Sequence, residues 1–388
     1  MPAEAYLSRG VSPTKDDVHE AIKKQDKGLF PGAFCKVIED IAGDKNWCSV
    51  IHADGAGTKS IIAYLYYKET GDASVFKGIA QDSLVMNIDD MACVGIVDNI
   101  ILSNTIGRNA HRIDKQILKE IIEGYGSVID DLKKYEINIA AAGGETADIG
   151  DLVSTVVVDS TAVARIERNK IIDCDNIEAG NVIIGLASFG QAVYETSFNS
   201  GIASNGITAA RHSLLSSHYR KYSEAYSPTI KENLVYGGKY KLTDKLPNSN
   251  QTVGQALLSP TRTYLPVIKN LLETKDNGIC ALIHCTGGAI SKSKNFGKSI
   301  TYIKDNLFEP PAIFAAIQEC GNIPRKEMFQ IFNMGQRLEI YCKPEKADAI
   351  INAIKKFNID AKIIGRTEKS PDGKNKVIVK FKGEEFIY

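Results

Sequence analysis

The chain has 388 residues, with 47 basic and 47 acidic side chains. This length favours two or three domains, and a hydrophobic content of 44% excludes a disordered chain. The charge balance argues against nucleic acid or an anionic membrane as the main partner, because both select a basic surface. No apolar run approaches the roughly 20 residues that a membrane-spanning helix needs. We find no signal-peptide pattern and no paired cysteine motif among the eight cysteines, and therefore expect a cytoplasmic protein with reduced thiols.

In chain order, apolar periodicity predicts alternating strands and helices. The first half should contain strands at 48–53, 96–102, 137–142 and 152–166 and helices at 81–94 and 111–135, while the apolar run 60–67 fits either element. After a polar stretch at 167–180, the second half should contain strands at 181–188, 279–284, 337–342, 359–364 and 376–381 and a helix at 346–357. Residues 219–251 lack aliphatic periodicity and predict a surface excursion. We therefore expect an α/β (α+β) chain with two mixed domains, residues 1–166 and 167–388.

Two glycine-rich segments, each after a strand-like run, carry the strongest chemical signal. Residues 52–59 read H-A-D-G-A-G-T-K and residues 142–146 read A-G-G-E-T, so each predicts a turn that joins glycines to a carboxylate. Glycine lets backbone N–H groups approach a ligand, and Mg²⁺ binds nucleotide phosphates through one or two carboxylates. Three aspartates of the predicted helix 81–94 lie between the two segments. The pattern predicts a site for ATP and Mg²⁺.

The expected metal ligands are Asp54, Asp82, Asp89, Asp90 and Glu145. The expected nucleotide contacts are Gly55, Gly57, Thr58, Asp82, Gly143, Gly144 and Thr146. For any one of these acids a solvated helix face is the alternative. Lys59 fits a phosphate-binding point charge or an ordinary surface lysine. The chain has neither a P-loop nor a dinucleotide-binding glycine motif.

A second group of segments suits phosphate or substrate binding. It comprises the G-I-A-S-N-G, P-T-R and H-C-T-G-G sequences, and its expected substrate-binding residues are Ser204, Asn205, Gly206, Arg262, Thr286, Gly287 and Gly288. Arg262 fits bidentate phosphate binding or a surface role. His284, which follows an apolar run, is by itself more typical of a hydrogen-bonded core histidine than of a catalyst. Cys35 fits a buried thiol better than a nucleophile.

Together these segments resemble the aminoimidazole ribonucleotide synthetases, the phosphoribosylformylglycinamidine cyclo-ligases. The family's D-G-V-G-T-K, G-G-E-T-A, S-N-G, L-L-x-P-T-R-x-Y and H-x-T-G-G sequences are similar to residues 54–59, 143–147, 204–206, 257–264 and 284–288. Its aspartate-bearing helix and its G-N to F-N-x-G block are similar to residues 80–90 and 321–335. The resemblance runs from about residue 50 to 366. This chain departs from the family at Ser103, where an aspartate is expected, at 31–34 and at 191–236.

The resemblance implies two α/β halves, with the N-terminal sheets of a homodimer pairing into a barrel-like core and a C-terminal α/β sandwich. It implies ATP-dependent ring closure of formylglycinamidine ribonucleotide to aminoimidazole ribonucleotide in purine biosynthesis, through phosphorylation of the formamide oxygen. Catalytic roles are expected for Asp54, Lys59, Asp90, Glu145 and His284. One alternative is a related ATP-using enzyme, such as thiamine monophosphate kinase or selenophosphate synthetase, for which Cys35-Lys36 is a faint candidate motif. The other is a non-catalytic nucleotide-binding paralogue, which Ser103 would favour.

Overall fold

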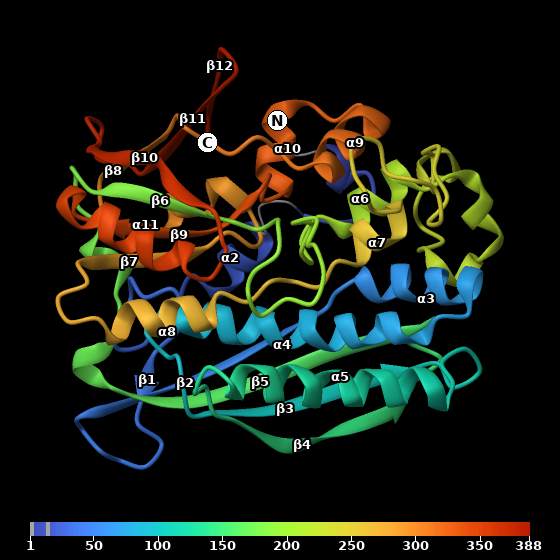
Figure 1. Cartoon of the computed structure of the whole chain (residues 1–388), viewed down its shortest axis with the longest axis horizontal. Helices are drawn as coiled ribbons and strands as arrows, with labels where there is room; N and C mark the ends of the chain where they lie inside the picture. Colours follow the sequence, from blue (N-terminus) through green and yellow to red (C-terminus); the bar gives the residue numbers. More distant parts are fainter. Residues whose placement is uncertain (1–3, 13–15) are drawn as a thin grey trace.

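The computed structural model describes residues 4–12 and 16–388. Its two halves are each built on one sheet, and the helices α4 and α5 lie against the sheet at the bottom of Figure 1. The first sheet has the strand order β1-β2-β5-β3-β4, and the second has the order β12-β11-β8-β10-β6-β9-β7. This mixed α/β architecture confirms the predicted fold class. Neither sheet closes into a barrel within the described residues.

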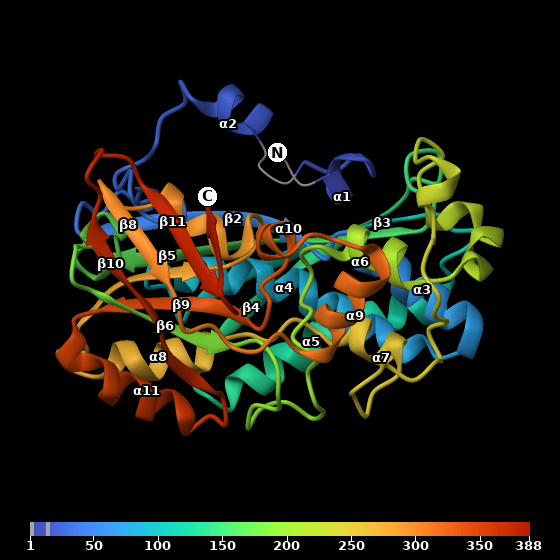
Figure 2. The ribbon, with the colours of Figure 1, turned by 90° about the horizontal axis from the view of Figure 1, so that it is seen from above.

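The first half contains β2, α4 and α5 at the places where apolar periodicity predicts them. Its elements are α1 (Glu4–Leu7), α2 (Asp16–Ile22), β1 (Ile38–Glu39), β2 (Trp47–Gly55), α3 (Lys59–Thr70), α4 (Phe76–Ala92), β3 (Ile100–Arg108), α5 (Lys115–Lys133), β4 (Ile139–Asp148) and β5 (Val156–Glu167). The ambiguous run 60–67 is thus helical, and it belongs to α3. Figure 2 shows α1 and α2 at the periphery, with α1 packed against α6.

The five-stranded sheet buries only one of its faces. Along β5 the residues at even positions from 156 to 164 are buried, because they face α4 and α5. The opposite face exposes apolar side chains: Ile51, Ile101 and Val157 are 54%, 50% and 40% accessible. An antiparallel strand with alternating burial typically has one face on a core and one facing outward. Here the outward face carries more large apolar residues than water alone would favour.

The second half contains the seven-stranded sheet. Its elements are β6 (Val182–Ala187), α6 (Ile207–Leu214), α7 (Val253–Leu258), α8 (Leu265–Glu273), β7 (Ile279–His284), η7 (Ala289–Asn295), β8 (Ile300–Lys304), α9 (Ala312–Gly321), α10 (Arg325–Ile331), β9 (Gln336–Cys342), α11 (Ala347–Lys355), β10 (Ala361–Lys369), β11 (Lys376–Phe381) and β12 (Glu384–Ile387). Short 3₁₀ turns are η1 (Ala73–Val75), η2 (Arg168–Lys170), η3 (Cys174–Asn176), η4 (Ser217–Lys221), η5 (Ser223–Ala225), η6 (Glu232–Leu234) and η8 (Pro344–Lys346). Helix α11 packs on β6 and β10, whereas η7 packs on β8, β9 and β11. No helix in the described part of the chain is both long enough and apolar enough to cross a bilayer.

Two local expectations are wrong. Residues 143–146 do not form a turn, because they lie inside β4, where Gly144 packs directly on the side chain of Asn104. Residues 219–251 are irregular but are not a mere surface excursion. Within this stretch Tyr219 and Tyr236 are fully buried. Each phenol group has a hydrogen-bond partner inside the protein: Tyr219 donates to Glu69, and Tyr236 donates to the carbonyl of Ala225.

Candidate active site

Segments from both halves line one cleft of about 650 Å³. Its walls come from the end of β2, from α4, from the loops before α6 and after β7, from η7 and α10, and from residues 6–12. The cleft brings together these predicted site residues: Asp54, Gly55, Gly57, Asp90, Ser204, Asn205, Thr286, Gly287 and Gly288. Residues as far apart in sequence as Tyr6 and Ile331 therefore share one cavity.

The end of β2 places one carboxylate, that of Asp54, in the cleft, and a second acid, Asp159 of β5, lies on the other face of the sheet but close enough to feel its charge. Asp54 is exposed, and its Oδ1 accepts a hydrogen bond from the Gly55 amide at 2.7 Å. The strand register puts Gly55 opposite Asp159 of β5. Burial, together with the charge of Asp54, raises the pKa of Asp159. This concentration of negative charge would be relieved by a bound cation.

Asp90, at the end of α4, joins two histidines. Its Oδ1 accepts a hydrogen bond from Nδ1 of buried His284 at 2.6 Å, and its Oδ2 lies 3.4 Å from Nε2 of His52. Although burial opposes ionisation, the bonds from His284 and His52 hold the pKa of Asp90 well below its usual range. Burial and the nearby Arg337 lower the pKa of His284 to about 4. Asp90 is therefore a carboxylate, and His284 is a neutral imidazole that donates from Nδ1.

Asp82 and Asp89 share a face of α4, as their spacing predicts, but neither of them lines the cleft. Oδ1 of Asp82 accepts hydrogen bonds from the amide and hydroxyl of Thr261 at 2.7 and 2.6 Å. Asp89 accepts one from the Thr263 hydroxyl at 2.6 Å and one from the Tyr264 amide at 3.0 Å. Burial raises the pKa of Asp89 to about 7. Both acids thus hold the segment that follows α7.

Lys59 and Arg262 are buried in ion pairs rather than placed in the cleft. Lys59 is fully buried, and its Nζ donates to Asp82 at 2.9 Å and to the Ser259 carbonyl at 2.6 Å. Arg262 donates through Nε and Nη2 to both carboxylate oxygens of Glu195, at 2.9 and 2.5 Å. Bidentate binding by Arg262 is therefore directed at a protein carboxylate.

Glu145 lies on the outer face of the first sheet. The register aligns Gly55, Asp159, Thr105 and Glu145 across four strands, on the side away from α4. Glu145 is exposed, and its carboxylate accepts a hydrogen bond from the amide of its neighbour Thr146 at 3.0 Å. Gly143 and Gly144 accompany it on β4, and Ser103 sits at a register shift in the adjacent β3.

Two other predicted residues border the cleft without lining it. The Thr58 hydroxyl is 2.9 Å from that of Thr208. Gly206 has a φ of 84° as the residue before α6, and the ring of Phe332 packs against it so closely that no Cβ would fit. Cys35 is buried; its thiol donates to the Asp90 carbonyl, and burial raises its pKa well above the usual value, which makes it a poor nucleophile.

Sequence reasoning missed several residues that line the cleft. They are Tyr6, Val11, Ser12, His52, Met86, Lys292, Lys294, Gln330 and Ile331, among others. His52 was detectable, since it begins the H-A-D-G segment. Lys292 and Lys294 follow the H-C-T-G-G sequence, but nothing in their own spacing separates them from surface lysines.

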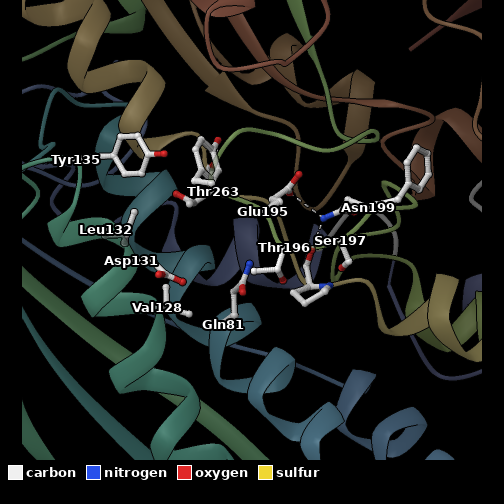
Figure 3. Close-up of a pocket in the computed structure, with 13 residues that line it drawn as sticks. Gln81, Val128, Asp131, Leu132, Tyr135, Glu195, Thr196, Ser197, Asn199 and Thr263 are labelled. Carbon is white, nitrogen blue, oxygen red and sulfur yellow. Dashed lines mark hydrogen bonds between the residues drawn. The ribbon is translucent and has the colours of Figure 1, made fainter.

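A second, smaller pocket of about 110 Å³ lies on the other side of the Pro260–Thr263 segment from the cleft (Figure 3). In that view Leu132 of α5 and Tyr135, just beyond the end of this helix, face Glu195 and Asn199 across the pocket. Pro260 and Thr263 line it, while Thr261 between them is 2.9 Å from the hydroxyl of the cleft residue Ser204. The Pro260–Thr263 segment thus separates the two cavities.

The donor set in the cleft fits a magnesium ion shared with a ligand better than an all-protein metal site. In the part of the chain that the structure describes, no three His, Cys, Asp or Glu side chains are grouped so that they could hold a metal. The five predicted acids do not converge, because Asp82 and Asp89 face the core and Glu145 faces outward. Asp54 and Asp90 remain in the cleft, and Mg²⁺ bound to phosphates needs only one or two carboxylates.

Comparison with known proteins identifies the family. The models of the AIR synthase related protein family match residues 32–166 (N-terminal domain) and 178–378 (C-terminal domain). The phosphoribosylformylglycinamidine cyclo-ligase of Methanocaldococcus jannaschii is 32% identical over 337 residues, 85% of this chain and 81% of the relative. That of Methanococcus vannielii is 30% identical over 374 residues, 95% of this chain and 91% of the relative.

Solved structures agree in fold. Thiamine monophosphate kinase from Aquifex aeolicus has a TM-score of 0.54 at 12% identity, with 96% of each chain covered. T. maritima PurL complexed with FGAR has a TM-score of 0.55 at 14% identity, covering 99% of this chain and 54% of that one. At such identities the similarity is one of fold alone, whereas the sequence relatives and both family models agree on the lineage. The chain belongs to the AIR synthase related protein family, among relatives that are phosphoribosylformylglycinamidine cyclo-ligases.

Proposed function

We propose that this chain catalyses the ATP-dependent ring closure of formylglycinamidine ribonucleotide to aminoimidazole ribonucleotide, with release of ADP and phosphate. The observation that carries the proposal is the cleft in which three of the segments similar to the cyclo-ligase motifs, those at 54–59, 204–206 and 284–288, meet Asp90 of α4. The formamide oxygen attacks the γ-phosphorus of ATP, and the bond to ADP breaks. The amidine nitrogen then attacks the activated carbon, the bond to phosphate breaks, and the nitrogen loses a proton.

Such a reaction needs positioning and charge neutralisation more than a strong base. Asp54 and Asp90 would hold a magnesium ion together with the ATP phosphates, and this ion would supply neutralisation of charge on the transferred group. Asp90 is oriented for that task by His284, whose Nδ1 fixes one carboxylate oxygen at 2.6 Å. The exposed backbone at Gly57 and Gly287 allows close approach of phosphate oxygens.

Buried residues around the cleft are assigned positioning roles. Lys59 and Asp82 fix Thr261, and the Thr261 hydroxyl meets that of Ser204 in the cleft wall. The ion pair between Arg262 and Glu195 joins this segment to the loop that carries Glu195. The proposal thus moves Lys59 from direct phosphate contact to support of the substrate-binding loop.

We also propose that two copies of the chain pair through the outer face of the first sheet. Two observations support this pairing. The face exposes the large apolar side chains of Ile51, Ile101 and Val157. It also carries Glu145, which belongs to a segment similar to a family motif but lies outside the cleft of its own chain. In a dimer Glu145 would act at the subunit interface. Glu145→Gln should abolish turnover without changing the melting temperature, and Ile101→Glu should yield monomers in light scattering. The cytoplasmic location and the division of the chain between residues 166 and 167 remain part of the proposal.

The decisive experiment supplies purified protein with ATP, Mg²⁺ and formylglycinamidine ribonucleotide and measures aminoimidazole product by its diazo colour. One product per ADP is expected. ATP turnover only with thiamine monophosphate or selenide would instead assign a related kinase or synthetase. Nucleotide binding without any turnover would indicate a non-catalytic paralogue.

A further inference from the structure

The cleft has a charge polarity that the predicted site residues do not explain. Its β2 and α4 side carries Asp54 and Asp90, and its η7 side carries Lys292 and Lys294, which are the lysines among its described lining residues. Both lysines are half-buried and belong to the seven residues of η7. We propose that Lys292 and Lys294, with Thr286 and Gly287, form a subsite for a phosphate group of a bound nucleotide. The identity of the nucleotide rests on the proposed function, whereas the binding of a phosphate group at these residues does not.

Lys292 is held in position with its charge directed at the cleft. Its Nζ donates to the Thr286 hydroxyl at 2.6 Å and lies 4.3 Å from the centre of the Phe34 ring. An ammonium group has three N–H donors, and Thr286 takes one of them. A cation held against an aromatic face keeps its charge while losing part of its hydration. The remaining donors are thus available to an anion next to the exposed backbone of Gly287.

The side of η7 that faces the core is held by hydrogen bonds, so the backbone that carries the two lysines is fixed. Buried Lys304 donates to the Ile290 carbonyl at 2.7 Å and to the Ser293 hydroxyl at 2.9 Å. The same ammonium pairs with buried Glu339 at 2.5 Å. Ile290 and Ser293 therefore face the core, while Lys292 and Lys294 face the cavity. Pre-organised donors of this kind lose little entropy when a ligand binds.

The two cations that the sequence offered as phosphate ligands, Arg262 and Lys59, do not face the cleft. Arg262, the candidate phosphate ligand, is engaged by Glu195, and Lys59 is engaged by Asp82. A nucleotide phosphate placed against the acidic side without cations would be repelled. The phosphate could be the 5′-phosphate of the ribonucleotide or a phosphate of ATP. The two sources share the same chemistry and are separated by the probes below.

The test measures calorimetric binding of ribose 5-phosphate, of ribose and of ADP, each without metal. It compares the wild type with Lys292→Met, Lys294→Met and the double variant, and uses Lys298→Met as the matched control. Lys298 lies four residues beyond Lys294 and is 79% exposed in a pair with Asp175 outside the cleft. Methionine keeps the apolar stem of lysine and removes only the charge. Lys292→Arg keeps the charge, and thermal melting verifies that each variant is folded.

We expect ribose 5-phosphate to bind the wild type and the control, ribose to bind neither, and the double variant to lose at least 10-fold in affinity. A loss confined to ADP would also support the phosphate subsite and would assign it to ATP. Equal binding by the wild type and the double variant, or equal losses in the control, would overturn the proposal, as would a wild type that binds neither phosphate. Because binding is read without turnover, a protein that makes no aminoimidazole product would refute the proposed function alone.

Discussion

The buried pair of Lys59 and Asp82 offers a quantitative test of how the site is supported. Both side chains are fully buried, and Nζ lies 2.9 Å from Oδ1. The other carboxylate oxygen, Oδ2, has no hydrogen-bond partner among the described residues. Lys59→Met would therefore leave a carboxylate in the core with only Thr261 to stabilise it. Removing one member of a buried ion pair costs about 3–5 kcal/mol, which lowers the ratio of folded to unfolded protein by two to four orders of magnitude on the scale of about 1.4 kcal/mol per tenfold.

The assay is urea unfolding followed by circular dichroism and by the fluorescence of Trp47, the only tryptophan in the sequence. Lys298→Met is again the control, because its pair with Asp175 is shorter, at 2.6 Å, yet reaches solvent, with Lys298 79% and Asp175 27% exposed. A surface pair should contribute at most about 1 kcal/mol. The double variant Lys59→Met/Asp82→Asn should be more stable than Lys59→Met, since no unpaired charge remains in the core. If Lys59→Met costs no more than Lys298→Met, or if the double variant is the less stable one, the argument from burial is wrong.

Three further predictions concern activity, acid stability and backbone conformation. Asp54→Asn should lower kcat at least about 100-fold with an unchanged melting temperature, since Asp54 is exposed in the cleft; near-normal rates would contradict its proposed role. Hydrogen bonds from Arg165 lower the pKa of Asp40 to about 2, so this carboxylate stabilises the fold above about pH 4, and that contribution is lost as the pH falls from about 4 to about 2; Arg165→Met should flatten this part of the stability profile. Gly206→Ala should destabilise by about 1 kcal/mol or more beyond Gly190→Ala, because both glycines have left-handed φ values of 84° and 93° but only Gly206 is packed against a ring; equal unfolding midpoints would show that the ring yields.

The sequence predicts elements well where periodicity is long or apolar runs are bounded by turns. The strands 279–284 and 376–381 begin and end where expected, and α4 and α5 lie within the expected ranges or close to them. The short strand β8, whose five residues are all buried, gives no alternating pattern and was missed. The short helices α6, α7 and α10 have too few turns to establish a helical period.

The candidate site was predictable as a set of motifs but not as a geometry. Helical spacing correctly places Asp82 and Asp89 on one face, yet the sequence does not say what that face meets, because its partners lie more than 170 residues away. The same holds for Arg262, whose carboxylate partner Glu195 stands in a segment with no recognisable pattern. Glu145 was grouped with the other acids because its motif suggested a turn, whereas the parallel pairing of β3 and β4 carries it to the outer face.

The spacing of the two buried acids has a geometric reason. Seven residues of α-helix advance by about 10.5 Å, and the three steps from Thr261 to Tyr264 span at most about 10 Å of chain. An aspartate at each end of this interval can therefore reach one end of the segment from Thr261 to Tyr264, and the hydrogen bonds of Asp82 and Asp89 show this match. Because Thr261 also contacts Ser204, the two acids connect α4 to the wall of the cleft. In this fold, acids that resemble metal ligands in sequence can act by fixing the loop that faces the substrate, while Asp54 and Asp90 are left to meet the phosphates.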